Sequence, residues 1–428
     1  MKIGMLVDTY LPILGGAEVH VLELSRALRA QGDEVAICTA VENNFVIAGG
    51  EAVRNNKKNS LPFPRGGAAG LPPQPTTEES RLQSSGQRGG MGEDFPTLRL
   101  PMLTGGGWRA VVAIPFALPR LVTFIRQVDF VHCHYSFLLA ALGTFLGRMF
   151  GKRTAVTLHG LGTLDSSVGR SALWRLYRWV SLKLADTVIA TSEEMKSVAS
   201  RFTSAEKIVV IPNGVDSRKF VPAPKPEIPR GEVIILTMRR LAPKNGVQYL
   251  VEAAPEVVAA VPGVCFWVAG EGKLEGYIRM RVAELGLEEH FRFLGIVPHS
   301  QTPDIYRQAD IAVFPSSAES TSLACLEAMC TEKAIVASSL AAYKELLGVS
   351  GERGLLVPLF DREGSDYNAP LNLPAERIHA LALAIISLAG DAALRLRLGQ
   401  SARSFAAGRY DWKVIAEETR CIYLGERG

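Results

Sequence analysis

The sequence lacks the features that mark secreted, membrane-spanning and metal-binding proteins. Its six cysteines include no C-x-x-C pair, and its seven histidines show no metal-ligand spacing. The cysteines are therefore interpreted as buried thiols in a reducing compartment, and no metal is predicted. No window reaches the roughly 18 apolar residues that a spanning helix needs, and the apolar run at 3–7 is too short for the core of a signal peptide. We therefore expect a cytoplasmic protein.

The sequence also lacks a large excess of charge of one sign. The chain carries 47 Lys and Arg against 43 Asp and Glu, a net charge of +4. This mild excess fits an anionic ligand or an anionic membrane surface, but it does not indicate a nucleic-acid-binding protein. The 428 residues, of which 47% are hydrophobic, can build more than one core. Two globular domains are therefore the default expectation.

Short apolar runs alternate with helical patterns along most of the chain. The run at 3–7 precedes a helical pattern at 17–30 and a second apolar run at 34–39. This order is a β-α-β unit, which predicts a parallel, doubly wound sheet. The alternation starts again at 233, after a proline-rich, aperiodic stretch at 219–232 that marks a domain boundary. The fold class is therefore predicted as α/β, with two Rossmann-like doubly wound domains that face a central cleft.

The predicted division has three parts: an N-terminal domain over 1–218, a C-terminal domain over 219–405, and a C-terminal helix over 406–428. We expect this last helix to pack back on the N-terminal domain. Within the first domain, the segment 43–96 is rich in Gly, Pro, Ser, Asn and charge, and it shows almost no periodicity. That composition predicts a mostly disordered surface insertion without chemistry.

The stretch that follows the apolar run IAVF combines acids, hydroxyl groups and a helix start. Glu319 lies in the predicted turn, and Glu327 lies about one turn into the next helix. Ser320, Thr321 and Ser322 are each plausible N-caps, so backbone N–H groups at this helix start can meet an anion. Ligands of open α/β sheets bind at such strand ends.

Three cations follow the first strand of the second domain, and they are Arg239, Arg240 and Lys244. Cations and a helix N-terminus suit a diphosphate, because they bind it and stabilise the negative charge that develops on it as a leaving group. Glutamates suit the hydroxyl groups of a ribose and a sugar, so the combination predicts a nucleotide-sugar site. No D-x-D motif is present, and the cations would take the part that a divalent ion plays elsewhere.

Other strand ends carry weaker signals. Gly15 and Gly16 let the backbone approach a ligand closely, although a tight turn alone explains them equally well. The G-x-G-x-x-x-G run that begins at Gly270 is only a near miss for a dinucleotide fingerprint. His134 and His159 end successive apolar runs at the presumed ligand edge. For this pair a structural and a functional role are about equally plausible.

The stretch at 168–185 combines basic and aromatic residues in a helical pattern. Trp174, Tyr177 and Trp179 interleave with arginines and a lysine. An amphipathic basic helix that is rich in aromatics can lie on an anionic bilayer. An ordinary surface helix with a solvated basic face explains the pattern at least as well. Peripheral membrane contact through 168–185 is therefore a hypothesis.

With these motifs the chain resembles the retaining, GT-B-fold glycosyltransferases of glycosyltransferase family 4. The resemblance covers nearly the whole chain outside 43–96 and is carried by LGGAEVHV, DFVHCHYSF, TLHG, ADTVIATSEEM, VVIPNGVD, RRLAPKNGV, VAGEG, FLGIV and ESTSLACLEAM. Its most specific part is the pair Glu319 and Glu327, eight residues apart, which is similar to the paired-glutamate signature of the family.

The resemblance implies metal-independent transfer of a sugar, with retention, from a UDP- or GDP-sugar to a hydroxyl acceptor. The departing phosphate would accept the proton of the acceptor, which would be a glycan or a lipid-linked molecule. The first domain would bind the acceptor and the second the donor. No cofactor and no nucleic-acid partner are expected, and the protein would work in the cytoplasm or at the inner face of the membrane.

The resemblance also assigns roles to single residues. The implied catalytic residues are His134, Arg240, Lys244 and Glu319. The implied donor-binding residues are Gly15, Gly16, Arg239, Gly270, Ile296, Ser320, Thr321, Ser322, Leu323 and Glu327. Within these sets, Glu319 would contact the donor sugar and Glu327 the ribose. Arg240 and Lys244 would hold the diphosphate, with Arg239 as a competitor for that role.

The chain departs from the family at one point of the signature. Family members commonly read Glu-Gly-Phe-Gly where this chain reads Glu-Ser-Thr-Ser, which leaves the conformation of this loop and the identity of the donor open. Two alternative functions remain: a nucleotide-sugar epimerase or sugar-phosphate synthase on the same scaffold, and an inactive sugar-nucleotide-binding protein. An NAD-dependent dehydrogenase is the weakest alternative, because no complete dinucleotide fingerprint follows the first strand.

Overall fold

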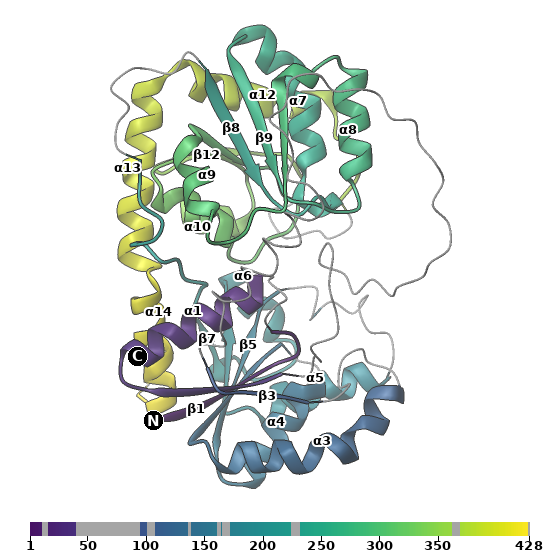
Figure 1. The fold of residues 1–428 in the computed structure, drawn as a ribbon, viewed down its shortest axis with the longest axis vertical. Helices are drawn as coiled ribbons and strands as arrows, with labels where there is room; N and C mark the ends of the chain where they lie inside the picture. The colour runs from purple at the N-terminus through teal and green to yellow at the C-terminus, as the bar shows by residue number, and fades with distance from the viewer. Residues whose placement is uncertain are drawn as a thin grey trace, which may run out of the picture.

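The computed structural model of the chain describes residues 1–10, 16–39, 95–100, 108–135, 138–160, 164, 172–223, 232–361 and 369–426. Of the predicted insertion at 43–96, all but the last two residues lie outside these ranges. The described residues form two lobes, one above the other, and the last two long helices run along one side of both (Figure 1).

The first lobe is a seven-stranded, all-parallel sheet in the order β3-β2-β1-β4-β5-β6-β7. Its strands are β1 (Lys2–Val7), β2 (Glu34–Thr39), β3 (Thr97–Arg99), β4 (Phe130–His134), β5 (Arg153–Leu158), β6 (Thr187–Ala190) and β7 (Ile208–Val210). Its helices are α1 (Gly16–Ala30), α3 (Trp108–Arg126), α4 (Leu138–Met149), α5 (Ala172–Leu184) and α6 (Glu193–Ala199), with a short 3-10 helix, η3 (Ala205–Lys207).

The second lobe is a six-stranded parallel sheet in the order β10-β9-β8-β11-β12-β13. Its strands are β8 (Val233–Met238), β9 (Val264–Ala269), β10 (Phe291–Gly295), β11 (Ile311–Phe314), β12 (Ala334–Ser338) and β13 (Leu355–Val357). Its helices are α7 (Val247–Ala260), α8 (Glu275–Glu284), α9 (Thr302–Gln308), α10 (Leu323–Cys330), α11 (Ala341–Leu347), α12 (Ala375–Gly390) and α13 (Ala392–Arg409), with 3-10 helices η4 (Pro243–Asn245) and η5 (Glu288–His290). The predicted α/β class, with two doubly wound domains, is confirmed.

Each sheet has a hydrophobic cluster on both faces, because successive strand residues point to opposite sides. In β1, Met5 packs in one cluster of the first domain and Leu6 in the other. In β8, Leu236 and Ile235 divide in the same way between the two clusters of the second domain. Helices therefore cover both faces of each sheet, and the strand ends are left to form the site.

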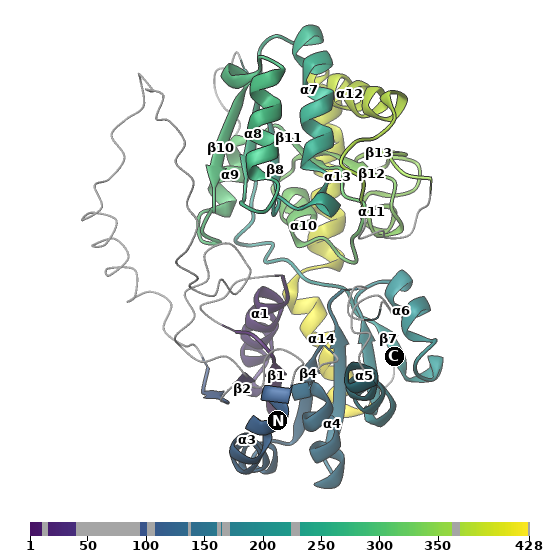
Figure 2. The ribbon, with the colours of Figure 1, turned by 90° about the vertical axis from the view of Figure 1, so that its right-hand side faces the viewer.

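The last helix, α14 (Trp412–Leu424), lies on the first domain. It runs beside α1 in both views (Figures 1 and 2), and its Trp412, Ile415 and Tyr423 pack in the same cluster as Met5. Arg153 donates to the carbonyls of Ile422 and Tyr423 at 3.1 and 3.0 Å, which caps the carboxyl end of the helix. The chain thus crosses between the lobes twice.

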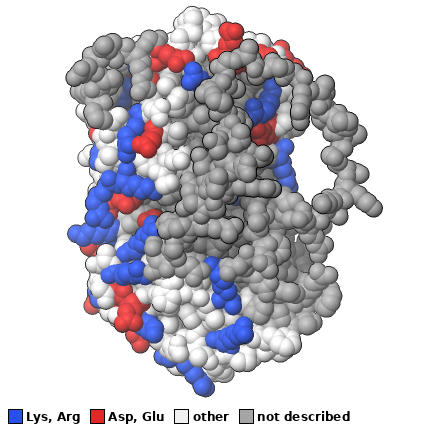
Figure 3. Space-filling model, in the orientation of Figure 1, with Lys and Arg blue, Asp and Glu red and all other residues white. Residues whose placement is uncertain are grey.

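The lengths of the helices and the charges on the surface bear on whether the protein meets a membrane. Among the described helices, none alone is long and apolar enough to cross a membrane, and only α12 and α13 pass that test as a pair, across a bend of 99°. On the face shown in Figure 3, basic and acidic side chains are interspersed over both lobes, as the small net charge leads one to expect. No single-sign patch dominates the visible described surface there.

Candidate active site

A cavity of about 630 Å³ opens between the two domains, at the carboxyl ends of strands from both sheets. From the first domain it is lined by residues that follow β4 and β5, and from the second by residues that follow β8 and β11. Its size is in the range of small-molecule sites. The described residues that line it include nine of the predicted set: Gly16, Arg239, Arg240, Lys244, Glu319, Ser320, Thr321, Ser322 and Leu323.

The residues 319–323, here called the donor loop, are held by Arg239. Its guanidinium forms an ion pair with Glu319 and donates to the hydroxyls of Ser322 and Ser316, both at 2.9 Å. The side chain of Arg239 is only 7% exposed and that of Glu319 14%. Arg239 therefore fixes the loop, whereas its neighbour Arg240 is exposed and turned to the cavity.

Lys244 lies in η4 and reaches the same cavity. Burial, together with the nearby charges of Arg239 and Arg240, lowers the pKa of its ammonium group to about 8. Three cations crowded on one wall repel one another, and an anion between them relieves that repulsion. This wall is therefore suited to a diphosphate.

Helix α10 begins beside these cations. Its N-cap is Ser322, whose hydroxyl accepts from the backbone N–H of Cys325 at 3.3 Å. The other backbone N–H groups of the first turn lie at the N-terminus of the helix, which lines the cavity. Free N–H donors and the helix dipole favour an anion there. The cap and the cations thus lie on the same side of the cleft.

Glu327 lies one turn into α10 but does not line this cavity. Its carboxylate accepts from Nε2 of His299 at 3.2 Å. Nζ of Lys219 donates to Nδ1 of the same imidazole at 3.0 Å, which leaves the proton of the ring on Nε2. Glu327, which was predicted to bind the ribose, is therefore held in place by His299, and His299 is held by Lys219. Neither of these two residues was identified from the sequence.

A cluster of imidazoles lies under the first-domain wall of the cavity. Nδ1 of His134 is 2.8 Å from Nε2 of His159, and Nε2 of His134 is 3.5 Å from Sδ of Met5. His134 is 1% exposed, and only His159 lines the cavity. Burial and the neighbouring imidazoles lower the pKa of both rings well below the ordinary value. The structure therefore puts His159, and not His134, at the cleft.

Among the described residues, three histidines of this cluster lie close enough together to be considered as metal ligands. Ring nitrogens of His20, His134 and His159 lie within 4.8 Å of one another. However, the His134 to His159 separation of 2.8 Å is a hydrogen bond, and Nδ1 of His20 is bonded to Oδ1 of Asn213 at 2.9 Å. The rings are thus already engaged with protein partners.

Gly15 is a predicted donor residue that is outside the described residues. Ile296 and Gly270 do not line the cavity, and Ile296 is 59% exposed beyond the end of β10. Gly270 has φ of 122°, and a Cβ there would lie 2.1 Å from the carbonyl oxygen of Arg239. Its role is therefore close packing behind the Arg239 segment, which only glycine permits.

Several cavity residues were missed by the sequence analysis. They are Ala17, Tyr135, Asn213, Met238, Ala242, Pro243, Asn245, Gly272, Lys273 and Ala324. Tyr135 follows β4 with φ of 67°, a left-handed conformation that a bulky residue rarely adopts and that is concentrated at functional sites. Asn213 belongs to the VVIPNGVD motif, which was a signal that the sequence analysis noted but did not resolve into a residue.

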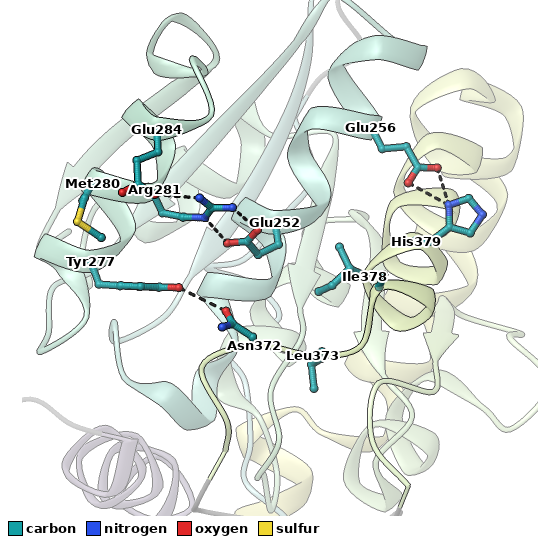
Figure 4. Close-up of a pocket in the computed structure, with 11 residues that line it drawn as sticks. Glu252, Glu256, Tyr277, Met280, Arg281, Glu284, Asn372, Leu373, Ile378 and His379 are labelled. Atoms are coloured by element: carbon teal, nitrogen blue, oxygen red, sulfur yellow. Dashed lines mark hydrogen bonds and ion pairs between the residues drawn. The ribbon is translucent and has the colours of Figure 1, made fainter.

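A second hollow, of about 700 Å³, lies on the second domain between α7, α8 and the start of α12 (Figure 4). Its charged residues pair with each other: Arg281 with Glu252 at 2.6 Å and with Glu284 at 2.8 Å, and His379 with Glu256 at 2.8 Å. These are ordinary surface ion pairs, which already satisfy one another. The cleft between the domains therefore remains the candidate active site.

Known families and proteins agree with this geometry. Residues 15–214 match the family described as Glycosyl transferase 4-like domain, and residues 232–365 match Glycosyl transferases group 1. A phosphatidyl-myo-inositol mannosyltransferase of Mycolicibacterium smegmatis is 27% identical, over 99% of this chain and 93% of its own length. A D-inositol 3-phosphate glycosyltransferase of Corynebacterium glutamicum is 26% identical, over 96% and 91%.

Solved structures share the fold. The crystal structure of Anabaena HepE in complex with UDP and glucose has a TM-score of 0.70 at 17% identity, covering 99% of this chain and all of that one. Sucrose-phosphate synthase from Thermosynechococcus elongatus gives 0.67 at 20% identity, covering 99% of each chain. Two family matches that span most of both domains, full-length relatives and a shared architecture lead to one conclusion: the chain belongs to the group 1, family 4 glycosyltransferases with the GT-B fold.

Proposed function

We propose that this glycosyltransferase moves a sugar, with retention and without a metal, from a UDP- or GDP-sugar to a hydroxyl group of a lipid-linked acceptor. One observation carries the proposal: Arg240, Lys244 and the start of α10 lie on the same cavity as Glu319. The cations and the helix start bind the diphosphate and stabilise its charge as it leaves. Glu319 accepts hydrogen bonds from the hydroxyls of the donor sugar.

Retention is supported by the scarcity of bases on the acceptor side. Among the described residues that line the cavity, Glu319 is the only carboxylate, and it belongs to the donor loop and is paired with Arg239. The cavity-facing His159 has a pKa well below its ordinary value, so it is a weak base. The departing phosphate is then the best base for the acceptor proton, and it lies on the face from which the nucleotide leaves.

A membrane-bound acceptor is supported by the helices of the first domain. Large apolar side chains are exposed on three neighbouring helices: Phe116 on α3, Phe145 and Met149 on α4, and Leu176 and Trp179 on α5. Exposed apolar groups near basic side chains suit an anionic bilayer. Of the aromatic residues predicted to face the membrane, Tyr177 is buried and does not contribute.

The relatives suggest the chemistry of the acceptor. One is named for a phosphatidyl-myo-inositol acceptor and another for D-inositol 3-phosphate. We propose an inositol-type hydroxyl acceptor on a lipid, reached from the cytoplasmic face of the membrane. All six cysteines are free thiols, which suits that reducing compartment.

The test is a transfer assay on the purified protein. Thermal shift with UDP- and GDP-sugars identifies the donor, because a bound ligand stabilises the fold. The donor is then offered with phosphatidylinositol vesicles, with soluble inositol phosphate, or alone, in the presence of EDTA, and NMR reads the anomeric configuration of the product. We expect lipid-dependent transfer with retention. Inversion, a loss of activity in EDTA, or conversion of the donor without an acceptor would each overturn the corresponding part.

A further inference from the structure

We infer that Thr321 and Asn213 are positioning residues that tie the donor loop to the first domain, so that the loop is set for transfer only when the two domains face each other. This inference rests on the proposed function. It concerns how the donor loop acquires its shape.

Two hydrogen bonds join the donor loop to the other domain through one residue. The hydroxyl of Thr321 donates to the carbonyl of Thr191, which follows β6, and the carbonyl of Thr321 accepts from Nδ2 of Asn213 at 2.9 Å. Thr321 is 7% exposed and Asn213 6%. Water cannot readily replace these bonds, and breaking one leaves a buried polar group without a partner.

The second bond is extended by a buried histidine of α1. Because the carbonyl of Thr321 can only accept, Nδ2 of Asn213 faces it, and Oδ1 of Asn213 must face His20. Nδ1 of His20 therefore donates to Oδ1 at 2.9 Å. Burial lowers the pKa of His20 to about 4, so the ring is neutral at working pH, and its single proton is on Nδ1. The chain of donors runs from α1, through Asn213, to the donor loop.

The donor loop is thus held from both sides of the cleft. Arg239 of the second domain binds Glu319 and Ser322, whereas Thr321 is bound by the first domain. Leu323 packs against the first-domain cluster that contains α14, and a Cβ on Gly16 would touch its Cδ1 at 3.7 Å. Separation of the domains would remove the contacts of Thr321 and Leu323 but leave those of Glu319 and Ser322. The backbone at Thr321 would then be free to move.

This arrangement predicts an effect on turnover that exceeds the effect on nucleotide binding. Arg240, Lys244 and the helix start at Ser322, which we assign to the diphosphate, belong to the second domain, and Ser322 is held there by Arg239. They do not depend on the contacts of Thr321. Glu319 must hold the sugar while the acceptor reacts, and its position depends on the loop. The two hydrogen bonds of Thr321 to Thr191 and Asn213 are here called the latch. Loss of the latch should therefore lower kcat and leave the affinity for the nucleoside diphosphate nearly unchanged.

The test compares Thr321→Val with Thr321→Ser in the full chain. Valine has nearly the shape of threonine but lacks the hydroxyl, whereas serine keeps it. We expect T321V to lower kcat about tenfold, the factor that loss of one buried hydrogen bond gives, with T321S within about threefold of wild type. The dissociation constants of UDP and GDP should change less than threefold in both. Hydrogen exchange at the amides of residues 320–323 should accelerate in T321V but not in the strands β8 to β12.

A second variant guards against misfolding. Asn213→Asp keeps the oxygen that faces His20 but places an oxygen against the carbonyl of Thr321, and it should reproduce the T321V pattern. Asn372→Asp, in the distant hollow of Figure 4, is the matched control and should match wild type. A lower melting temperature with unchanged kcat and exchange, or equal losses in T321V and T321S, overturns the inference.

The experiments distinguish failure of the proposed function from failure of the inference about Thr321 and Asn213. If the wild-type protein transfers no sugar from any donor, the function falls, and the exchange of residues 320–323 in T321V and N213D still decides whether the latch exists. If wild type is active and T321V is equally active with unchanged exchange, the latch alone is overturned.

Discussion

Arg239 at the end of β8 and Glu319 after β11 form an ion pair in the wall of the cleft. Both side chains are largely shielded from water, and the same guanidinium also binds Ser316 and Ser322. A carboxylate held in this way presents its remaining lone pairs in a fixed direction, toward the cavity. The pair therefore holds the Glu319 carboxylate at the cavity, where the proposed function has it accept hydrogen bonds from the donor sugar.

Replacing Glu319 with alanine should lower turnover by roughly 10²–10³-fold, the loss that removal of one transition-state contact gives. Steady-state kinetics with the donor at saturation measures this, and far-UV circular dichroism checks the fold. The control is Glu289→Ala in η5, an exposed acid far from the cavity. A Glu319→Ala protein as fast as the control would show that the donor loop is not the site of transfer.

The two neighbouring arginines should separate a structural from a binding role. Arg239→Ala removes the ion pair with Glu319 and the hydrogen bonds to Ser322 and Ser316 in a shielded place. Loss of one partner of a buried pair costs roughly 3–5 kcal/mol, so the melting temperature should fall. Arg240→Ala removes an exposed side chain that lines the cavity, and it should weaken UDP or GDP binding with little change in stability. Calorimetry and thermal melts on both variants provide the comparison. Equal melting temperatures would contradict the anchoring role of Arg239.

The fold could be predicted from the sequence because its strands and helices alternate with clear periods. Buried parallel strands such as β9 and β11 are short and wholly apolar, and each is followed by a helix. The placement of Glu319 and Lys244 also followed, because residues after parallel strands meet at one edge of the sheet.

What could not be predicted depends on register and on contacts between distant residues. His134 is the last residue of β4 and still points into the layer between sheet and α1, so His159, one strand away, takes the place at the cavity. Arg239 and Arg240 point in different directions although they are adjacent. Thr321 and Asn213 are 108 residues apart and meet only across the domains. No periodicity in the sequence contains that information.

Acid should destabilise the protein through the buried imidazoles. Burial lowers the pKa of His132 to about 3, and the ring is bonded to Tyr423 at 2.6 Å and Thr157 at 2.7 Å. Above pH 6.5 the ring is neutral in both states and adds no pH dependence. As pH falls below 6.5, only the unfolded chain takes up the proton, so the free energy of unfolding drops by about 1.4 kcal/mol per pH unit.

The variant His132→Asn has no titratable group at this position, so it lacks the pH dependence of stability that His132 contributes. The variant should be less stable than wild type at pH 7.5, because it loses packing. The difference between the two free energies of unfolding should become smaller by about 2 kcal/mol when the pH is lowered to 5. Urea midpoints at the two pH values measure it. Parallel changes in the two proteins would mean that His132 does not contribute to the acid sensitivity.

Trp179 should matter for vesicle binding if α5 meets a membrane. Its side chain is 55% exposed, and Arg175 on the same helix is exposed too. Trp179→Ser should lower cosedimentation with anionic vesicles about tenfold, since burial of a large apolar side chain is worth at least that factor. The control is Leu424→Ser at the end of α14, where a leucine is 45% exposed. Absence of vesicle binding by the wild-type protein would remove the membrane hypothesis.

The affinity for a diphosphate should decrease as the pH rises above 8, because Lys244 then loses its charge in the free protein. The pKa of this lysine is about 8 in the free protein, lowered by burial and by Arg239 and Arg240. A bound diphosphate favours the ammonium form, so the pKa of Lys244 is higher in the complex. Below pH 8 the lysine is charged before and after binding, and affinity does not depend on it. Above pH 8 binding must take up a proton, and affinity should drop about tenfold per pH unit.

Lys244→Arg separates this effect from the titration of the ligand. An arginine remains charged over the whole range, so affinity of K244R for UDP or GDP should be nearly flat where that of wild type falls. The nucleobase and the phosphate titrate identically with both proteins, and they cancel in the ratio of the two dissociation constants. Measured by calorimetry from pH 7 to 9, that ratio should change about tenfold, almost all of it above pH 8. A ratio that stays constant from pH 7 to 9 would show that Lys244 takes up no proton when the diphosphate binds, and it would contradict this prediction.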